Sequence, residues 1–274
     1  MFSPYSFFIP LIFSDLSYYS KESLIVKRRY SLGLHVGAHA FTWVELSKTA
    51  HDIHFIHHQT VALPLSQDIS LKCFSTQAHL SVASDRVMEK RIAFQSPITD
   101  RQMANLIKRN TEMYLPNIKE SLLSDFVIDH HDNFNVAIFS VRESDVVSIF
   151  QLTHALKIKV VSIEPDSYAL LRAIRFSGLV SQSLSAFLYR ESDHFRVLIF
   201  RGERVVDEER CALPFQYITA RYDISQLEGI YMFGDIDSDK PVVSIDPFST
   251  FDIPASDKND GLLIEFGLAL RGLL

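Results

Sequence analysis

Apolar and polar residues begin to alternate regularly at residues 31–46. Leu32, Leu34 and Val36 are separated by small or polar residues, which is the period of a half-buried strand. A small-residue turn begins at Gly37, and residues 41–46 leave it as a returning strand. Residues 53–63 continue the pattern as a third strand, so the chain is predicted to open with a three-stranded meander.

Helices and strands alternate in the next part of the chain. The helix predicted over 99–114 starts at a capping box of Thr99 and Gln102 and carries one apolar face. A second helix is predicted from Ser144 and a third after Asp166, which we expect to cap it. The remaining apolar runs predict strands at 78–83, 87–94, 126–129, 135–141 and 158–163.

The second half repeats the opening pattern. Residues 184–190, 195–201 and 204–210 predict another three-stranded meander. Two such meanders in series indicate a duplicated α/β architecture. No long helix is predicted directly after the second meander. Further strands are predicted at 229–233 and 241–245, and a closing helix ends the chain.

Composition narrows the class of protein. The 274 residues are 47% hydrophobic and 22% charged, which is typical of a globular protein with a sizeable core. The formal net charge of -6 argues against general nucleic-acid binding, which needs a basic face. Two cysteines, Cys73 and Cys211, give neither a disulfide framework nor a zinc-binding spacing, so we expect a reducing, cytoplasmic location.

The N-terminal residues 1–28 are expected to lie outside the fold. Their apolar run at 7–13 is too short to span a bilayer. No basic residue precedes that run, and no small-residue cleavage site follows it, so the segment does not match a signal peptide. Disorder and contact with a membrane surface are both open for these residues.

A cluster of histidines in the third strand raises the possibility of a metal site. Alternation along a strand places His54 and His58 on one face, and His51 and His57 on the other. No carboxylate or thiolate nearby in the sequence completes a compact ligand set. A solvated strand is therefore favoured over a metal site.

Five stretches, in order, resemble the PilM family and its shorter HofM-type relatives, which are actin-like proteins of type IV pilus and DNA-uptake machines. The resemblance covers about residues 30–274. The stretches read GLHVGAHAFTWVEL, RIAFQSPITDRQMANLIKRNTEMYLP, VVSIEPDSYALLRAI, LEGIYMFGD with VVSIDPF, and EFGLALRGL.

The resemblance implies an α/β, actin-like (ribonuclease H-like) duplicated fold. A small α+β subdomain is inserted into its first half, and its second half is truncated. The implied divisions are an extension at 1–28, a first actin-like subdomain at 29–83 and 155–180 with the closing helix 260–274, an inserted subdomain at 84–154, and a reduced second subdomain at 181–259.

The family's nucleotide motifs are degenerate here. Nucleotide-binding members carry Asp-x-Gly in the first hairpin, where the Asp holds magnesium through water and turn amides hold phosphate, and often a lysine further on. This sequence has His35 at the Asp position, Gly37 at the glycine and Thr42 at the lysine. An ordinary glycine-bearing hairpin would look similar. The second hairpin reads RESDH without a glycine, the next phosphate turn reads CALPF, and the adenosine loop is reduced to residues 233–235.

The resemblance therefore predicts a scaffold that binds no nucleotide or metal and catalyses no reaction. Its expected partner is the cytoplasmic N-terminal tail of a PilN-like bitopic inner-membrane protein, together with other pilus alignment-complex or motor components. It would sit at the inner membrane through that partner. The residues expected to contact the tail are Tyr114, Leu115, Pro116, Glu164, Asp166 and Tyr168. For each of them, ordinary packing or helix capping is the alternative role.

Two other readings stay open. An actin-superfamily ATP-binding protein or ATPase with divergent motifs could hold ATP and magnesium through Asp193, Asp235 and Asp237. A structural module with a different partner is also compatible with the pattern, because a fold does not fix a function.

Overall fold

The computed structural model describes most of the chain. Residues 1–28, predicted to be an N-terminal extension, lie outside the described part, as do Leu115, Pro116 and the three aspartates Asp193, Asp235 and Asp237. The side chains of residues 108–114 are not described either. The described residues are 29–37, 40–63, 72–114, 120–128, 135–179, 181–191, 194–234, 242–251, 253 and 262–274.

The first five-stranded sheet has the order β3-β2-β1-β4-β8. Its first three strands form the predicted antiparallel meander, which is confirmed, while β4 runs parallel to β1 and β8 parallel to β4. The strands are β1 (Arg29–Val36), β2 (Ala40–Lys48), β3 (Ile53–Ala62), β4 (Gln77–Val82) and β8 (Lys159–Pro165).

The second five-stranded sheet has the order β11-β10-β9-β12-β13. In both sheets the spatial order is third, second, first, fourth and fifth strand of the repeat, so the predicted duplication is confirmed. The strands are β9 (Leu184–Glu191), β10 (His194–Arg201), β11 (Arg204–Cys211), β12 (Ile230–Phe233) and β13 (Val243–Ser244).

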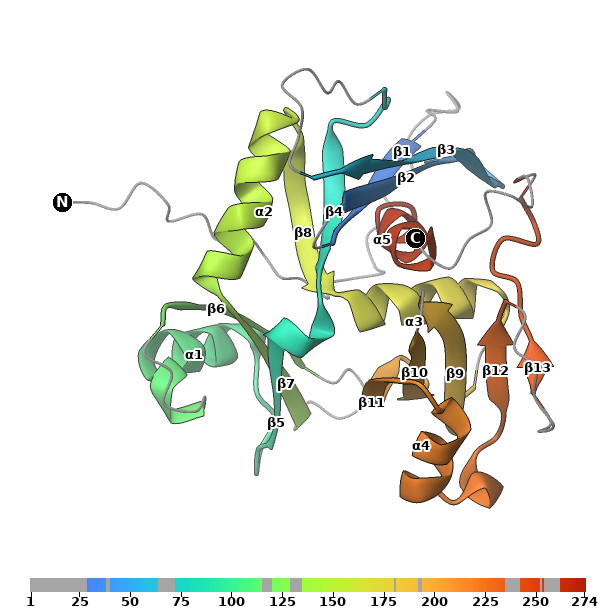
Figure 1. Ribbon diagram of the computed structural model, residues 1–274. Helices are drawn as coiled ribbons and strands as arrows, with labels where there is room; N and C mark the ends of the chain where they lie inside the picture. Colours follow the sequence, from blue (N-terminus) through green and yellow to red (C-terminus); the bar gives the residue numbers. More distant parts are fainter. Residues whose placement is uncertain are drawn as a thin grey trace.

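Two helices, α3 (Asp166–Phe176) and α5 (Leu263–Arg271), lie between the two sheets (Figure 1). One hydrophobic core joins residues of both sheets to both helices. Every residue of α5 from Leu263 to Leu270 is buried, and all but Glu265 are apolar or glycine, as expected for a helix enclosed in a core. The helices touch at Gly267, where an added Cβ would lie 1.8 Å from the backbone oxygen of Ala169. Glycine is therefore required at this crossing.

A third sheet, of three antiparallel strands in the order β5-β7-β6, stands apart from the other two (Figure 1). It carries α1 (Asp100–Tyr114), whose predicted capping box is confirmed. The Thr99 amide donates to Gln102 Oε1 at 2.9 Å, and the Gln102 amide donates to Thr99 Oγ1 at 3.4 Å. The strands are β5 (Val87–Ala93), β6 (Leu122–Ile128) and β7 (Asn135–Arg142), and the short helix η1 (Ser84–Arg86) leads into β5.

The structure differs from the sequence prediction at two helices. All but the last residue of helix α2 (Glu143–Ala155) fall in the range 84–154 assigned to the insertion, yet Val146 and Ile149 share a core with Leu80 of the first sheet. Helix α4 (Pro214–Arg221), with proline in its first turn, follows β11 where no helix was predicted. A short helix, η2 (Ile224–Gln226), comes next. Among the described residues, no helix has the length and apolarity needed to cross a bilayer.

Candidate functional site

Arg196 of β10 joins the two halves of the molecule. Its side chain is fully buried, and it holds the carboxylate of Asp166 with two bonds, Nη2 to Oδ1 at 2.6 Å and Nη1 to Oδ2 at 3.0 Å. Asp166 begins α3, directly after the last strand of the first sheet. A forked arginine–carboxylate pair of this kind is both strong and geometrically specific. Arg196 also pairs with Glu208 of β11.

A second arginine extends this pair into a network. Arg210 donates from Nε to Oε2 of Glu191 at 2.7 Å, and Arg196 Nη1 lies 3.5 Å from the other oxygen of Glu191. The Tyr189 hydroxyl donates to that same Glu191 oxygen at 2.9 Å. Three carboxylates therefore share two guanidinium groups. We call Asp166, Glu191, Arg196, Glu208 and Arg210 the cleft network.

The carboxylates of the cleft network differ in how well they are compensated. Burial favours the neutral form of Asp166, but the Arg196 guanidinium outweighs it and holds the pKa of Asp166 below its usual range. Burial raises the pKa of Glu208, and the nearby Asp166 charge adds to this although Arg196 opposes it. Burial therefore affects Glu208 more than its pairing with Arg196 does, whereas for Asp166 the pairing outweighs burial.

His35, Gly37 and Thr42, the three residues singled out in the degenerate first hairpin, each contact a group within the same sheet. His35 Nδ1 lies 2.7 Å from Ser81 Oγ, and burial lowers the pKa of the imidazole, which is then neutral at pH 7. The Gly37 amide donates to the carbonyl of Ala40 at 2.9 Å, inside its own turn. Thr42 Oγ1 lies 3.0 Å from the hydroxyl of Thr60 on the neighbouring strand.

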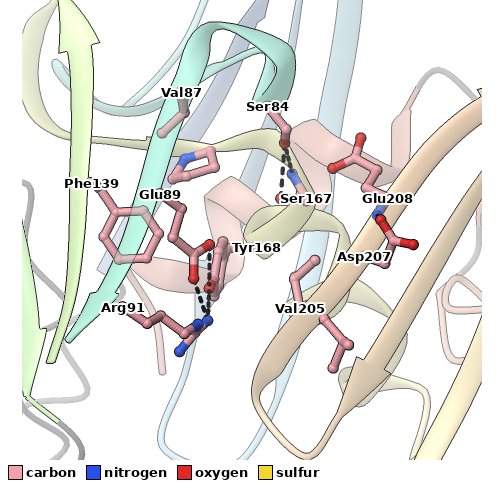
Figure 2. Close-up of a pocket in the computed structure, with 12 residues that line it drawn as sticks. Ser84, Val87, Glu89, Arg91, Phe139, Ser167, Tyr168, Val205, Asp207 and Glu208 are labelled. Atoms are coloured by element: carbon pink, nitrogen blue, oxygen red, sulfur yellow. Dashed lines mark hydrogen bonds and ion pairs between the residues drawn. The ribbon is translucent and has the colours of Figure 1, made fainter. Parts of the chain in front are cut away.

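A cavity of about 370 Å³ borders the cleft network. It lies where the insertion, the start of α3 and β11 meet, and Figure 2 shows Glu89, Arg91 and Tyr168 facing Val205 across it. Ser84 links the two features, because its amide donates to Asp166 Oδ1 at 3.0 Å while the residue lines the cavity. The lining residues are Ser84, Val87, Glu89, Arg91, Phe139, Pro165, Ser167, Tyr168, Val205, Val206, Asp207 and Glu208.

Among the predicted contact residues whose side chains the structure describes, Tyr168 lines this cavity. Its ring packs edge-on against Phe139, with centroids 5.6 Å apart. Its hydroxyl accepts from Arg91 Nη2 at 3.3 Å and donates to Glu89 Oε2 at 3.5 Å. Burial raises the pKa of Tyr168, so the hydroxyl remains protonated. Helix α3 thus presents a half-buried aromatic ring to the insertion.

The structure places the predicted peptide contacts Glu164 and Asp166 in the interior of the protein. Both are buried, with exposed fractions of 2% and 0%. Glu164 is held by Arg172 at 2.6 and 2.9 Å and also by Arg271. Nor does Asp166 cap α3: Pro165 stands at the N-cap, and the Asp166 carboxylate turns to Arg196. A buried carboxylate needs a paired cation, and these two carboxylates have theirs inside the protein.

Sequence reasoning placed Tyr114 at the end of α1, where the structure also has it, but its side chain is not described. The same reasoning missed Arg196. A signal was present, because Arg196 shares its strand face with Leu198 and Phe200, which are both fully buried. An arginine in line with two core residues requires an internal carboxylate partner. Only the fold shows that the main partner is Asp166.

The histidines of β3 are dispersed. His57 lies opposite Glu45 in the β2–β3 pairing, with Nδ1 3.6 Å from a Glu45 oxygen, and His58 packs edge-on against Phe55. Glu45 itself accepts the amides of Phe74 and Ser75 at 3.1 and 2.6 Å. Within the part of the chain that the structure describes, no three metal-binding side chains come together.

Comparison with known proteins identifies the fold. No model of a known protein family matches the chain, and no curated protein matches it. The solved "PilM-PilN type IV pilus biogenesis complex" matches with a TM-score of 0.62 at 13% identity, covering 89% of this chain and 98% of that one. The cytoplasmic domain of EpsL, an inner-membrane component of the type II secretion system of Vibrio cholerae, matches with a TM-score of 0.54 at 12% identity, covering 89% and 94%. The α/β, actin-like fold is thereby shown.

Proposed function

We propose that this chain is a non-catalytic adaptor of a type IV pilus, DNA-uptake or related secretion machine. In this proposal it lies in the cytoplasm at the inner membrane and binds the N-terminal tail of a PilN-like bitopic membrane protein. The observation that carries the proposal is the fold shared with a PilM–PilN complex over 98% of that solved chain. The match to EpsL supports the same class of machine.

The cavity supports the binding part of the proposal. It lies between the insertion and the body of the molecule, and its walls combine apolar residues with carboxylates. Tails of this kind carry hydrophobic and basic residues and need an apolar site with some acidic charge. Tyr168, on the cavity wall, is the described residue that we propose as a tail contact.

The cleft network supports the non-catalytic part. A magnesium–nucleotide site needs oxygen ligands that are available to the metal and turn amides that are available to phosphate. Both oxygens of Asp166 are bonded to Arg196, and the hairpin position expected to carry the metal-binding Asp is a neutral His35. The Gly37 amide is bonded within its turn. These contacts of Asp166, His35 and Gly37 support the proposal that the chain holds neither magnesium nor a triphosphate here.

Two titrations test the proposal. We expect a synthetic N-terminal tail peptide of a PilN-like single-span membrane protein to bind the purified protein, whereas a scrambled peptide of the same composition should not. Absence of binding would remove the adaptor function as stated. We expect fluorescent ATP with magnesium to show no saturable binding. Micromolar affinity for ATP would instead favour the alternative, an actin-superfamily ATP-binding protein or ATPase with divergent motifs.

A further inference from the structure

Basic residues gather at one end of the first five-stranded sheet, the end at which β1, β4 and β8 begin. These three strands are parallel neighbours, so their first residues lie at the same end. β2 is antiparallel to β1 and ends there, with Lys48 opposite Arg29. We call this end of the sheet the basic edge. Its described cations are Arg29, Lys48, Lys72, Lys157 and Lys159.

The charge of the basic edge is not balanced by the described part of the chain. Four of its cations are exposed and form no ion pair with any described residue: Arg29, Lys72, Lys157 and Lys159. The fifth, Lys48, donates to the carbonyl of Leu273 at 2.8 Å. The described carboxylates of this region are Asp52, which is exposed in the turn from β2 to β3, and Glu45, which is buried. A local excess of positive charge therefore stands on a chain whose formal net charge is -6.

An exposed aromatic ring lies among these cations. Phe74 is 69% exposed and stacks on Tyr30 of β1, with ring centroids 4.9 Å apart and ring planes inclined by 27°. The backbone at this point is held in place, because the buried carboxylate of Glu45 accepts the amides of Phe74 and Ser75 at 3.1 and 2.6 Å. Aromatic rings beside lysine and arginine are typical of side chains that lie at the level of lipid headgroups.

The chain enters the fold at this edge. Residues 1–28 precede β1, and their sequence contains the apolar run 7–13 and three more basic residues, Lys21, Lys27 and Arg28. Stable attachment to a membrane surface takes two signals, for example one apolar group together with one basic patch. The sequence therefore joins an apolar run to the basic edge through further positive charge.

The basic edge and the cavity lie at opposite ends of the first sheet. β4 begins at the edge, and Ser84, just beyond its other end, lines the cavity. β8 begins with Lys159 at the edge and ends with Pro165 on the cavity wall, running from the top of the view toward α3 (Figure 1). Strands of this length span about 20 Å. A surface that contacts the edge therefore leaves the cavity accessible.

We propose that the basic edge binds directly to the surface of a membrane that contains anionic lipids, with Phe74 among the headgroups. Each lysine or arginine near such a surface favours binding about fivefold, so the four unpaired cations together favour it by several hundredfold, on the order of what peripheral attachment needs. The aromatic ring adds apolar contact at the interface. This contact is separate from the tail binding of the proposed function and requires no partner protein.

Flotation of the full chain with vesicles tests the proposal. We expect binding to vesicles of phosphatidylcholine mixed with phosphatidylglycerol, and no binding to vesicles of phosphatidylcholine alone. Binding should weaken as the salt concentration rises from about 0.1 M to about 1 M, because the Debye length falls from about 10 Å to about 3 Å. Absence of binding to the anionic vesicles overturns the proposal.

Two variants with the same change in net charge locate the contact. The edge variant combines Lys72→Gln, Lys157→Gln and Lys159→Gln. The control variant changes three exposed cations of β5, α1 and β10 that form no ion pair with a described residue, and combines Lys90→Gln, Arg101→Gln and Arg201→Gln. The edge variant should bind anionic vesicles about a hundredfold more weakly, whereas the control should bind as the native chain does. Equal weakening in both variants overturns the proposal, provided that both keep the native urea-unfolding midpoint.

A tryptophan substitution reports whether the edge meets the bilayer itself. The one native tryptophan, Trp43, is fully buried, so its emission should change little. The emission of Phe74→Trp should shift to shorter wavelength on vesicle binding and should be quenched by lipids brominated near the headgroup end of their acyl chains. Leu213→Trp, at an exposed position before α4, should show neither effect.

The remaining outcomes separate this proposal from its rivals. Vesicle binding without a shift or quenching for Phe74→Trp overturns the orientation and with it the proposal. Duplex DNA that binds as tightly as the vesicles, and is lost in the edge variant, assigns the edge to nucleic acid and overturns it too. Because the vesicles contain no tail peptide, failure of tail binding leaves this inference standing, and failure of vesicle binding leaves the adaptor function standing.

Discussion

Replacing Arg196 by methionine should destabilise the protein more than any change to a surface ion pair. Methionine fills much of the same space but leaves Asp166 buried without its forked partner and Glu208 without its nearest cation. Removing one member of a buried pair costs about 3–5 kcal/mol, because a buried charge is left uncompensated. That is a large share of the roughly 5–15 kcal/mol by which a domain is stable.

The loss should depend on pH in a defined direction. In the native chain Arg196 keeps the pKa of Asp166 low against the effect of burial, so this contribution is present above the unfolded pKa of about 3.9 and is lost at lower pH. In Arg196→Met the largest opposing cause is gone, and only the weaker contributions of Ser84 and Arg210 still oppose burial, so the pKa of Asp166 should rise and the folded variant should take up a proton as the pH falls from 7. The deficit relative to the native chain should therefore shrink on acidification from pH 7.

Urea unfolding of both proteins at pH 7 and pH 5 measures these differences. The matched control is Arg86→Met, which removes an exposed pair with Asp145 at 3.4 Å and should cost only about 0–1 kcal/mol. A deficit for Arg196→Met below about 1 kcal/mol at pH 7, or one that is the same at both pH values, would refute the reasoning.

Two further substitutions test the core around α5. Burial raises the pKa of Glu265 to about 8, and its Oε2 has no hydrogen-bond partner among the described residues. The native chain should therefore lose stability as the pH rises from about 4.3 to about 8, by up to about 1.4 kcal/mol per pH unit, and Glu265→Gln should lack this slope in urea unfolding. Gly267→Ala places a methyl group 1.8 Å from the Ala169 carbonyl oxygen and should cost at least about 1–3 kcal/mol, visible as a lower melting temperature in calorimetry.

The sequence pattern predicted most helices and strands correctly, because the interactions that form a helix or strand involve residues close together in the sequence. The alternation around Leu32 and Leu34 reflects a strand buried on one side, and both residues are fully buried. The Thr99 and Gln102 capping box formed as expected, because its bonds join residues three apart. Helix α4 was missed because it is only eight residues long and lacks a strong apolar face signal.

The sequence by itself determined the two meanders and the apolar closing helix, because periodicity and residue identity are carried by neighbouring positions. The tertiary structure decided how the buried charges are paired. Asp166 was expected to cap a helix, yet its carboxylate is held by Arg196, thirty positions away and in the other half of the duplication. It also decided that β11, the insertion and the start of α3 line one cavity. Burial and charge pairing depend on which distant segments meet, and only the folded chain establishes that.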